Sequence, residues 1–282
     1  MAYRFVLLLS LVPMIAAAGP KITVQGHRGA HAQRPENTIA SFERAIDAGA
    51  DLVEIDTWVT KDDIVVVSHD PKPKHSICKA PPEVNKAIRE LTLAEVRQWD
   101  CGSLQDPDFP EQKTVPGAGV PTFDEVLNLA GRSKKFRFNI EVKTSPKNPE
   151  FAPPPDEYAK MILVGIRKHK LEKRVVVQSF DFRILHAMKQ IAPDITLAAL
   201  FSADRREFAA VAREAGTRIV AVHYKLATPE RVKEAHGAGL KVFAWTANTP
   251  DVWDQLIAAR VDSIITDDPD ALIRYLKQKG LR

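Results

Sequence analysis

Short apolar stretches alternate with amphipathic stretches along nearly the whole chain. The apolar stretches have the length and the β-branched content of buried strands. Between them, apolar residues recur at helical spacing, as Ile39, Phe42 and Ile46 do in the first such stretch. The predicted strands are residues 22–26, 51–59, 137–143, 175–179, 196–201, 219–224, 241–246 and 263–266. The predicted helices are residues 38–48, 122–132, 156–169, 182–191, 205–215, 229–237, 250–258 and 270–279.

This repeated strand–helix order predicts an α/β fold, a (β/α)₈ TIM barrel that spans residues 19–282 as one domain. A doubly wound sheet also alternates strands and helices. However, it rarely needs so many repeats, and no GxGxxG motif opens the first helix. Asn37 is expected to cap that helix, and Pro229 and Pro250 directly follow the capping candidates Thr228 and Thr249.

One break in this order follows the second strand. Residues 64–68 predict an extra strand that pairs back as a hairpin, and residues 71–119 are rich in proline, lysine and polar residues. Within them, residues 93–99 look helical, begun by Thr92 and Glu95. A second irregular stretch, residues 145–155, follows the third strand. Both lie at C-terminal strand ends, where barrel enzymes build their sites, so we expect 71–119 to form an inserted segment over the barrel mouth.

The first 18 residues resemble a secretory signal peptide. Arg4 supplies positive charge, residues 6–15 are apolar, and residues 16–18 are alanines that offer a cleavage site. The apolar run is about half of the roughly 20 residues that a membrane-spanning helix needs. We therefore expect cleavage, no stable membrane insertion and a periplasmic or secreted protein, with an uncleaved anchor as the alternative.

Composition says little about the partners of the protein. The formal net charge is +4 and the basic and acidic residues are interspersed, which gives no reason to expect nucleic acid as a partner. Cys78 and Cys101 are the only two cysteines, and both fall within residues 71–119. In an exported chain they are expected to form a disulfide, with two free thiols as the alternative.

Acidic side chains fall on one face of two predicted strands. Residues two apart in a strand share a face, so Glu54 and Asp56 lie together, opposite Val53 and Ile55. Glu141 lies on the polar face of the strand at 137–143. The apolar faces should meet the helices, which turns the acidic faces into the barrel. Unpaired ions there cost several kcal/mol each. Glu54, Asp56 and Glu141 are therefore predicted to bind one divalent metal, Mg²⁺ or Ca²⁺, with structural salt bridges as the alternative.

Two histidines end predicted strands on the same side of the barrel. His27 and His69 suit acid–base chemistry at neutral pH, because the reference pKa of histidine is about 6.5. Arg28 and Lys143 are predicted to bind an anionic substrate, or to pair with neighbouring carboxylates in the free protein. Trp245 is expected to form an apolar wall for the substrate or to serve packing. The histidines expected to be structural or superficial are His31, His75, His169, His186 and His236.

Several short motifs occur in order across nearly the whole chain. They are GHRG at 26–29, PENT at 35–38, VEIDTWVTKDD at 53–63, VSHDP at 67–71, NIEVK at 139–143, VVQSFD at 176–181, FAWTAN at 243–248 and ITDDP at 265–269. Each motif alone is weak, but together they resemble the glycerophosphodiester phosphodiesterase family. The inserted segment departs from the shorter members of that family and leaves the head-group preference open.

The resemblance implies a (β/α)₈ barrel that hydrolyses small-molecule glycerophosphodiesters to glycerol 3-phosphate and an alcohol, either directly or through a cyclic phosphate that water opens. The roles it implies are metal binding by Glu54, Asp56 and Glu141, acid–base catalysis by His27 and His69, and phosphate binding by Arg28 and Lys143.

Three alternatives stay open. A lysophospholipase D or a cyclising phosphodiester lyase would share the fold. A non-catalytic phosphodiester-binding protein would need Arg28 and Lys143 but neither catalytic histidine. A structural or interaction protein would have no use for carboxylates inside a barrel.

Overall fold

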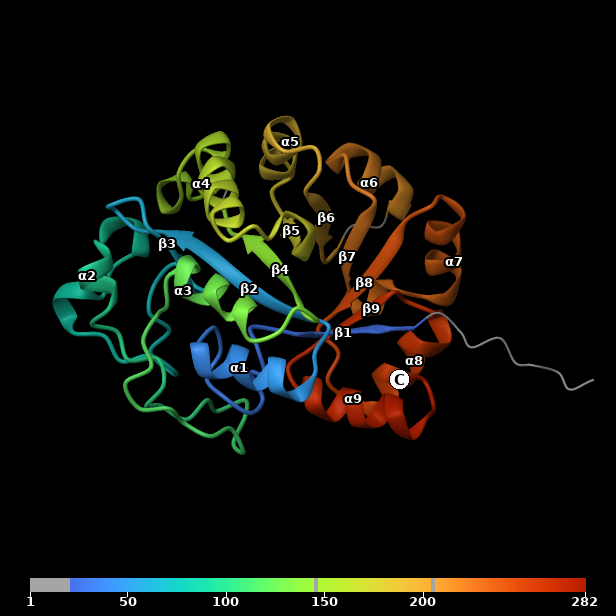
Figure 1. The fold of residues 1–282 in the computed structure, drawn as a ribbon, viewed down its shortest axis with the longest axis horizontal. Helices are drawn as coiled ribbons and strands as arrows, with labels where there is room; N and C mark the ends of the chain where they lie inside the picture. Colours follow the sequence, from blue (N-terminus) through green and yellow to red (C-terminus); the bar gives the residue numbers. More distant parts are fainter. Residues whose placement is uncertain (1–20, 145–146, 204–205) are drawn as a thin grey trace, which may run out of the picture.

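The computed structural model describes residues 21–144, 147–203 and 206–282. Within them, eight parallel strands form a closed barrel, because β1 pairs with β2 on one side and with β9 on the other (Figure 1). The strands are β1 (Thr23–Gly26), β2 (Leu52–Val59), β4 (Arg137–Val142), β5 (Val175–Ser179), β6 (Thr196–Phe201), β7 (Ile219–His223), β8 (Lys241–Trp245) and β9 (Ser263–Thr266). The predicted barrel is confirmed, and the predicted strand bounds hold to within one residue. The predicted signal peptide lies outside the described residues.

Helices surround the strands, as Figure 1 shows. They are α1 (Ile39–Ala48), α3 (Phe123–Leu127), α4 (Pro155–Lys168), α5 (Phe182–Ile191), α6 (Phe208–Ala215), α7 (Pro229–Gly237), α8 (Pro250–Ala259) and α9 (Pro269–Gln278). Short 3₁₀ turns are η1 (Pro82–Val84), η2 (Ile88–Glu90), η3 (Asn128–Gly131), η4 (Pro149–Phe151), η5 (Glu172–Arg174) and η6 (Tyr224–Leu226). No helix in the described part of the chain is long and apolar enough to cross a bilayer.

The predicted helix starts hold to within one residue except at α6, and the residue that caps α1 also differs from prediction. Thr38, not Asn37, caps α1, because the Thr38 side chain accepts the Ser41 N–H while Asn37 has a left-handed φ of 54°. Asn37 turns its amide towards the barrel instead and donates to Asp56 Oδ2 at 2.8 Å. Helix α6 begins at Phe208, because Glu207 still has a non-helical ψ of 140°. Residue 205, where this helix was predicted to begin, lies outside the described residues.

The two faces of each barrel strand belong to different layers. Val53, Ile55, Phe138 and Ile140 are fully buried in the main core between strands and helices, as their alternation predicted. The opposite faces point inward, where an apolar layer fills much of the barrel. Its members are Leu52, Val176, Ala198, Leu200, Ile219, Ala221, Phe243 and Ile265.

A buried polar chain completes this interior. Asn139 Nδ2 donates to Gln25 Oε1 at 2.9 Å and to Gln178 Oε1 at 3.1 Å. Gln25 Nε2 in turn donates to Ser263 Oγ at 2.9 Å. Because side chains fill the barrel below, the space for a ligand lies at the mouth.

Residues 71–119 pack as a small unit beside β2. The strand β3 (Val65–Val67) pairs antiparallel with β2 and leads into this unit. Its helix α2 (Leu93–Val96) begins with the predicted capping box of Thr92 and Glu95, but ends before residue 99 because Trp99 turns inward and its Nε1 donates to Val84 O. The predicted disulfide between Cys78 and Cys101 is present. The buried members of this second core are Trp58, Val66, Ile77, Cys78, Val84, Ile88, Leu91, Val96, Trp99, Cys101 and Val120.

Candidate active site

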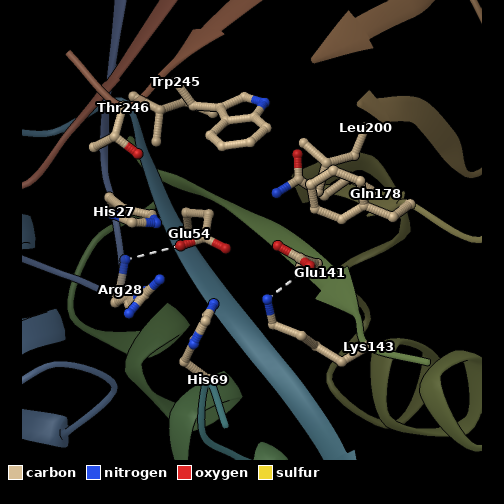
Figure 2. A pocket seen from close by; sticks show the side chains of 12 residues that line it. His27, Arg28, Glu54, His69, Glu141, Lys143, Gln178, Leu200, Trp245 and Thr246 are labelled. Atoms are coloured by element: carbon tan, nitrogen blue, oxygen red, sulfur yellow. Dashed lines mark hydrogen bonds and ion pairs between the residues drawn. The ribbon is translucent and has the colours of Figure 1, made fainter. Parts of the chain in front are cut away.

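A cavity of about 260 Å³ opens at the C-terminal ends of the barrel strands. One side is charged and the other is largely apolar, and Figure 2 shows the side chains converging on the space between. The lining residues are His27, Arg28, Glu54, His69, Glu141, Lys143, Gln178, Phe180, Leu200, Trp245, Thr246 and Ile265. The predicted catalytic, phosphate-binding and apolar-wall residues therefore line one cavity.

The strand register brings the three predicted metal ligands together. β2 and β4 pair in parallel with Asp56 opposite Glu141, and Glu54 lies two residues before Asp56 on the same face. Side-chain oxygen atoms of all three lie within 4.8 Å of one another, and all three residues are buried. Three hard oxygen donors at this spacing fit a divalent cation such as Mg²⁺ or Ca²⁺.

The electrostatics of this cluster also fit a cation. Burial, together with the neighbouring charges of Asp56 and Glu141, raises the pKa of Glu54 well above its ordinary value. Burial acts in the same direction on Asp56, but Lys143 and other nearby cations outweigh it and hold the pKa of Asp56 far below normal. The nearby cations do not balance the negative charge of three carboxylates. The remaining repulsion is felt by Glu54, whose pKa is raised.

Lys143 and Arg28 supply the fixed positive charge. Lys143 Nζ lies 3.1 Å from Asp56 Oδ1 and 2.8 Å from Glu141 Oε1. Arg28 Nη1 lies 2.7 Å from Glu36 Oε2, and its backbone N–H donates to Glu54 Oε2 at 2.8 Å. Both cations therefore pair with carboxylates, which was the alternative raised from the sequence. Arg28 Nε is buried and lies 3.5 Å from Asp56 Oδ2, an ion pair without a hydrogen bond.

Each of the two predicted catalytic histidines has a carboxylate beside its Nδ1 atom. His27 Nδ1 lies 2.6 Å from Asp267 Oδ1, and His69 Nδ1 lies 3.1 Å from Asp70 Oδ1. A carboxylate at Nδ1 fixes the proton there and leaves Nε2 available for proton exchange. Burial lowers the pKa of His27 below its ordinary value, although Asp267 opposes this.

The chain also matches a known protein family over most of its length. The model of the glycerophosphoryl diester phosphodiesterase family matches residues 27–271. The chain belongs to this family.

Individual relatives of the phosphodiesterase agree with this assignment. A glycerophosphodiester phosphodiesterase of Caldanaerobacter subterraneus is 32% identical over 260 residues, which is 92% of this chain and 100% of the relative. A solved structure from Silicibacter pomeroyi, assigned to glycerophosphoryl diester phosphodiesterases, is 29% identical with a TM-score of 0.85 and covers 93% of this chain and 95% of its own. The chain is thus an enzyme of the phosphoric diester hydrolase class.

A more distant structure supports the fold alone. An Oleispira antarctica phosphodiesterase, solved in complex with the product sn-glycerol-3-phosphate, is 23% identical with a TM-score of 0.77. It covers 91% of this chain and 97% of its own.

Several residues of the phosphodiesterase site escaped prediction from the sequence. Asp267 binds His27, and Asn248 donates in turn to Asp267 Oδ2. Both follow C-terminal strand ends, in the ITDDP and FAWTAN motifs, which was the available signal. His31, expected to be structural or superficial, is buried beside Asp267.

The apolar wall has more members than Trp245. Phe180 packs edge-on against Trp245 with ring centroids 5.7 Å apart, and it remains 49% exposed. Leu200 and Ile265 complete this side of the cavity. Phe180 directly follows β5 in the VVQSFD motif. That motif mixes polar and apolar residues, so nothing in it marked Phe180 as part of the cavity.

Proposed function

We propose that this phosphodiesterase hydrolyses glycerophosphodiesters to glycerol 3-phosphate and an alcohol, with a divalent metal and histidine acid–base catalysis. The observation that carries the proposal is the cavity itself, where His27 and His69 face the same space as the cluster of Glu54, Asp56 and Glu141. A protein that only binds phosphodiesters has no need of two histidines with carboxylate partners.

Different residues of the site bind the phosphate and transfer the protons. The guanidinium of Arg28 and the ammonium of Lys143 attract the phosphate and offset the charge that develops on it. One imidazole takes the proton of the attacking water or of an adjacent substrate hydroxyl, and the other gives a proton to the departing alkoxide. A cyclic phosphate formed by the hydroxyl is then opened by water, with the two imidazoles in exchanged roles. A divalent cation held by Glu54, Asp56 and Glu141 would polarise a phosphate oxygen, a contribution of several kcal/mol. Mg²⁺ and Ca²⁺ both suit this donor set.

The charged and apolar halves of the cavity suggest how the substrate lies. The phosphate faces Arg28 and Lys143, and the carbon atoms of one ester arm face Phe180 and Trp245. An acyl chain on that arm is compatible with the same wall, so lysophospholipid hydrolysis is the second candidate.

We also propose that the enzyme works outside the cytoplasm. The signal-like residues 1–18 motivate this proposal, and the Cys78–Cys101 disulfide supports it because disulfides persist in oxidising compartments. Expression with and without residues 1–18, followed by fractionation, tests it. Equal retention of both forms in the cytoplasm would contradict it.

Product analysis tests the reaction. Purified protein is incubated with glycerophosphocholine, glycerophosphoethanolamine and lysophosphatidylcholine, and products are followed by phosphorus NMR. We expect glycerol 3-phosphate from the first two substrates, loss of turnover with EDTA and recovery on addition of Mg²⁺ or Ca²⁺. A cyclic phosphate as the final product would indicate a lyase, and preference for lysophosphatidylcholine would indicate a lysophospholipase D. Turnover indifferent to EDTA would contradict the metal.

A further inference from the structure

A group of buried side chains lies directly behind His27. Asp267 is its centre: Oδ1 lies 2.6 Å from His27 Nδ1 and 3.4 Å from His31 Nδ1. The other oxygen, Oδ2, accepts from Asn248 Nδ2. One carboxylate therefore faces the ring nitrogens of two histidines, of which only His27 lines the cavity.

His31 faces carboxylates with both ring nitrogens. Its Nε2 lies 3.0 Å from Asp106 Oδ2 and 3.3 Å from Glu36 Oε2, while Nδ1 faces Asp267. Two nitrogens that both meet anionic oxygens are best satisfied when both carry a proton. Burial by itself would lower the pKa of His31, but Asp267 and Glu36 outweigh it and raise the pKa above the ordinary value.

The inserted segment holds His31 in this position. Asp106 supplies the carboxylate at Nε2, and the Phe109 ring packs on the imidazole with centroids 4.4 Å apart. Gln112 Nε2 donates to the His31 carbonyl at 2.6 Å. All three contacts come from residues 71–119, so this segment reaches the acid–base machinery without entering the cavity.

We propose that His31 and Asp267 are positioning residues for His27, and that the inserted segment fixes them through Asp106, Phe109 and Gln112. Asp267 holds the proton on His27 Nδ1 and keeps Nε2 directed at the substrate. His31 balances the charge of Asp267 beside the same oxygen, Oδ1, that faces His27, while Asn248 holds the other oxygen. This inference rests on the proposed function for its kinetic consequences, but its geometric content is independent of the substrate.

The histidine–carboxylate spacing here also matches that of metal ligands. A doubly protonated His31 excludes a metal on its ring, because a ligand nitrogen must be unprotonated. The protonation state of His31 therefore separates the two interpretations.

The test combines NMR with kinetics. Imidazole ¹⁵N–¹³C spectra and steady-state kinetics are recorded for the wild type, His31→Gln, Asp106→Asn and the control His169→Gln. His169, the residue that ends α4, is a matched control because its Nε2 lies 2.7 Å from Asp124 Oδ1 of α3 and it does not line the cavity.

The wild type should show His31 protonated on both nitrogens and His27 protonated on Nδ1. In His31→Gln, the Nδ1-protonated form of His27 should become partly replaced by the Nε2-protonated form. We expect kcat to fall by about 10- to 100-fold, as when outer partners of functional groups are removed, with KM nearly constant. Asp106→Asn should shift both readouts in the same direction by a smaller factor, and His169→Gln should shift neither.

Two results would overturn the proposal. One is a His31→Gln protein, or Asp106→Asn if the former does not fold, in which the His27 tautomer and kcat match the wild type while only the melting temperature falls. The other is a His31 ring with an unprotonated nitrogen at neutral pH. An inactive wild type would refute the proposed function instead, and the tautomer measurements would still decide the role of His31.

Discussion

The barrel and the inserted segment are stabilised by different means. The barrel strands pair with a neighbour on both sides, and a continuous apolar core separates them from the helices. Residues 71–119 have one short α-helix, the 3₁₀ turns η1 and η2, an isolated bridge between Lys79 and Asp100, and a small core in which Trp99 packs with Trp58 of β2. A unit with so little apolar surface to bury gains most from a cross-link, and the Cys78–Cys101 disulfide lies there.

The two regions also differ in what they contribute to the site. Apart from His69, which follows β3, the charged groups of the cavity lie on or directly after strands of the barrel. The inserted segment does not line the cavity but contacts His31, which lies behind His27. The cavity groups and the contacts that support them thus come from different regions, and variants in each region test whether catalysis and stability can be changed separately.

The largest contrast is expected in catalysis. His27→Ala or His69→Ala removes a ring that faces the cavity, so kcat should fall by about 10²–10⁴-fold. The control is His75→Ala, because His75 is exposed within the inserted segment and should be replaceable without loss. Steady-state kinetics measure the effect, and circular dichroism verifies the fold. Full activity in both His27 and His69 variants would remove these residues from the mechanism.

A matched pair of core truncations addresses stability. Phe138 in the barrel and Trp99 in the inserted segment are both buried, and each alanine substitution should cost about 3–5 kcal/mol. Phe138→Ala should lower the melting temperature of the whole molecule. Trp99→Ala should speed hydrogen exchange within residues 71–119 while the barrel strands stay protected. Equal acceleration in β5 to β8 would show that the two regions unfold together.

Removal of the disulfide should act on the inserted segment alone. The bridge closes a separation of 23 residues, so the Cys78→Ser, Cys101→Ser double variant should lose about 3 kcal/mol of local stability. Proteolysis within residues 71–119 should become faster, and a reducing agent should reproduce the effect in the wild type. A reduced protein as resistant as the oxidised one would argue against this role.

The smallest effects are expected at helix caps. Thr38 caps α1 of the barrel and Thr92 caps α2 of the inserted segment. Each alanine substitution should cost about 1 kcal/mol. Thr38→Ala should register in global unfolding, whereas Thr92→Ala should appear only as faster exchange near residues 93–96. A global shift of the same size for both variants would count against separate stabilisation.

The sequence pattern predicted the barrel well because its strands are apolar on the face that meets the helices. Glu54, Asp56 and Glu141 could be grouped because alternation along β2 and β4 put them on inward faces. Asp267 and Asn248 could not be assigned, since nothing in the local pattern says that the residue after β9 meets His27 or that the β8–α8 loop meets Asp267. The role of Asn37 was misjudged because a cap and an inward-facing amide are equally compatible with the residue before a helix. Asp106 belongs to an irregular segment, where no periodicity predicts which side chain turns towards the barrel.

The closure of the barrel by its first and last strands has a consequence for biosynthesis. His27, directly after the first strand, meets Asp267, 240 positions later and immediately after the last strand of the barrel. A ribosome-bound chain therefore carries both histidines of the cavity long before it carries the partner of His27. A chain released before residue 263 lacks both the strand that closes the barrel against β1 and the carboxylate partner of His27.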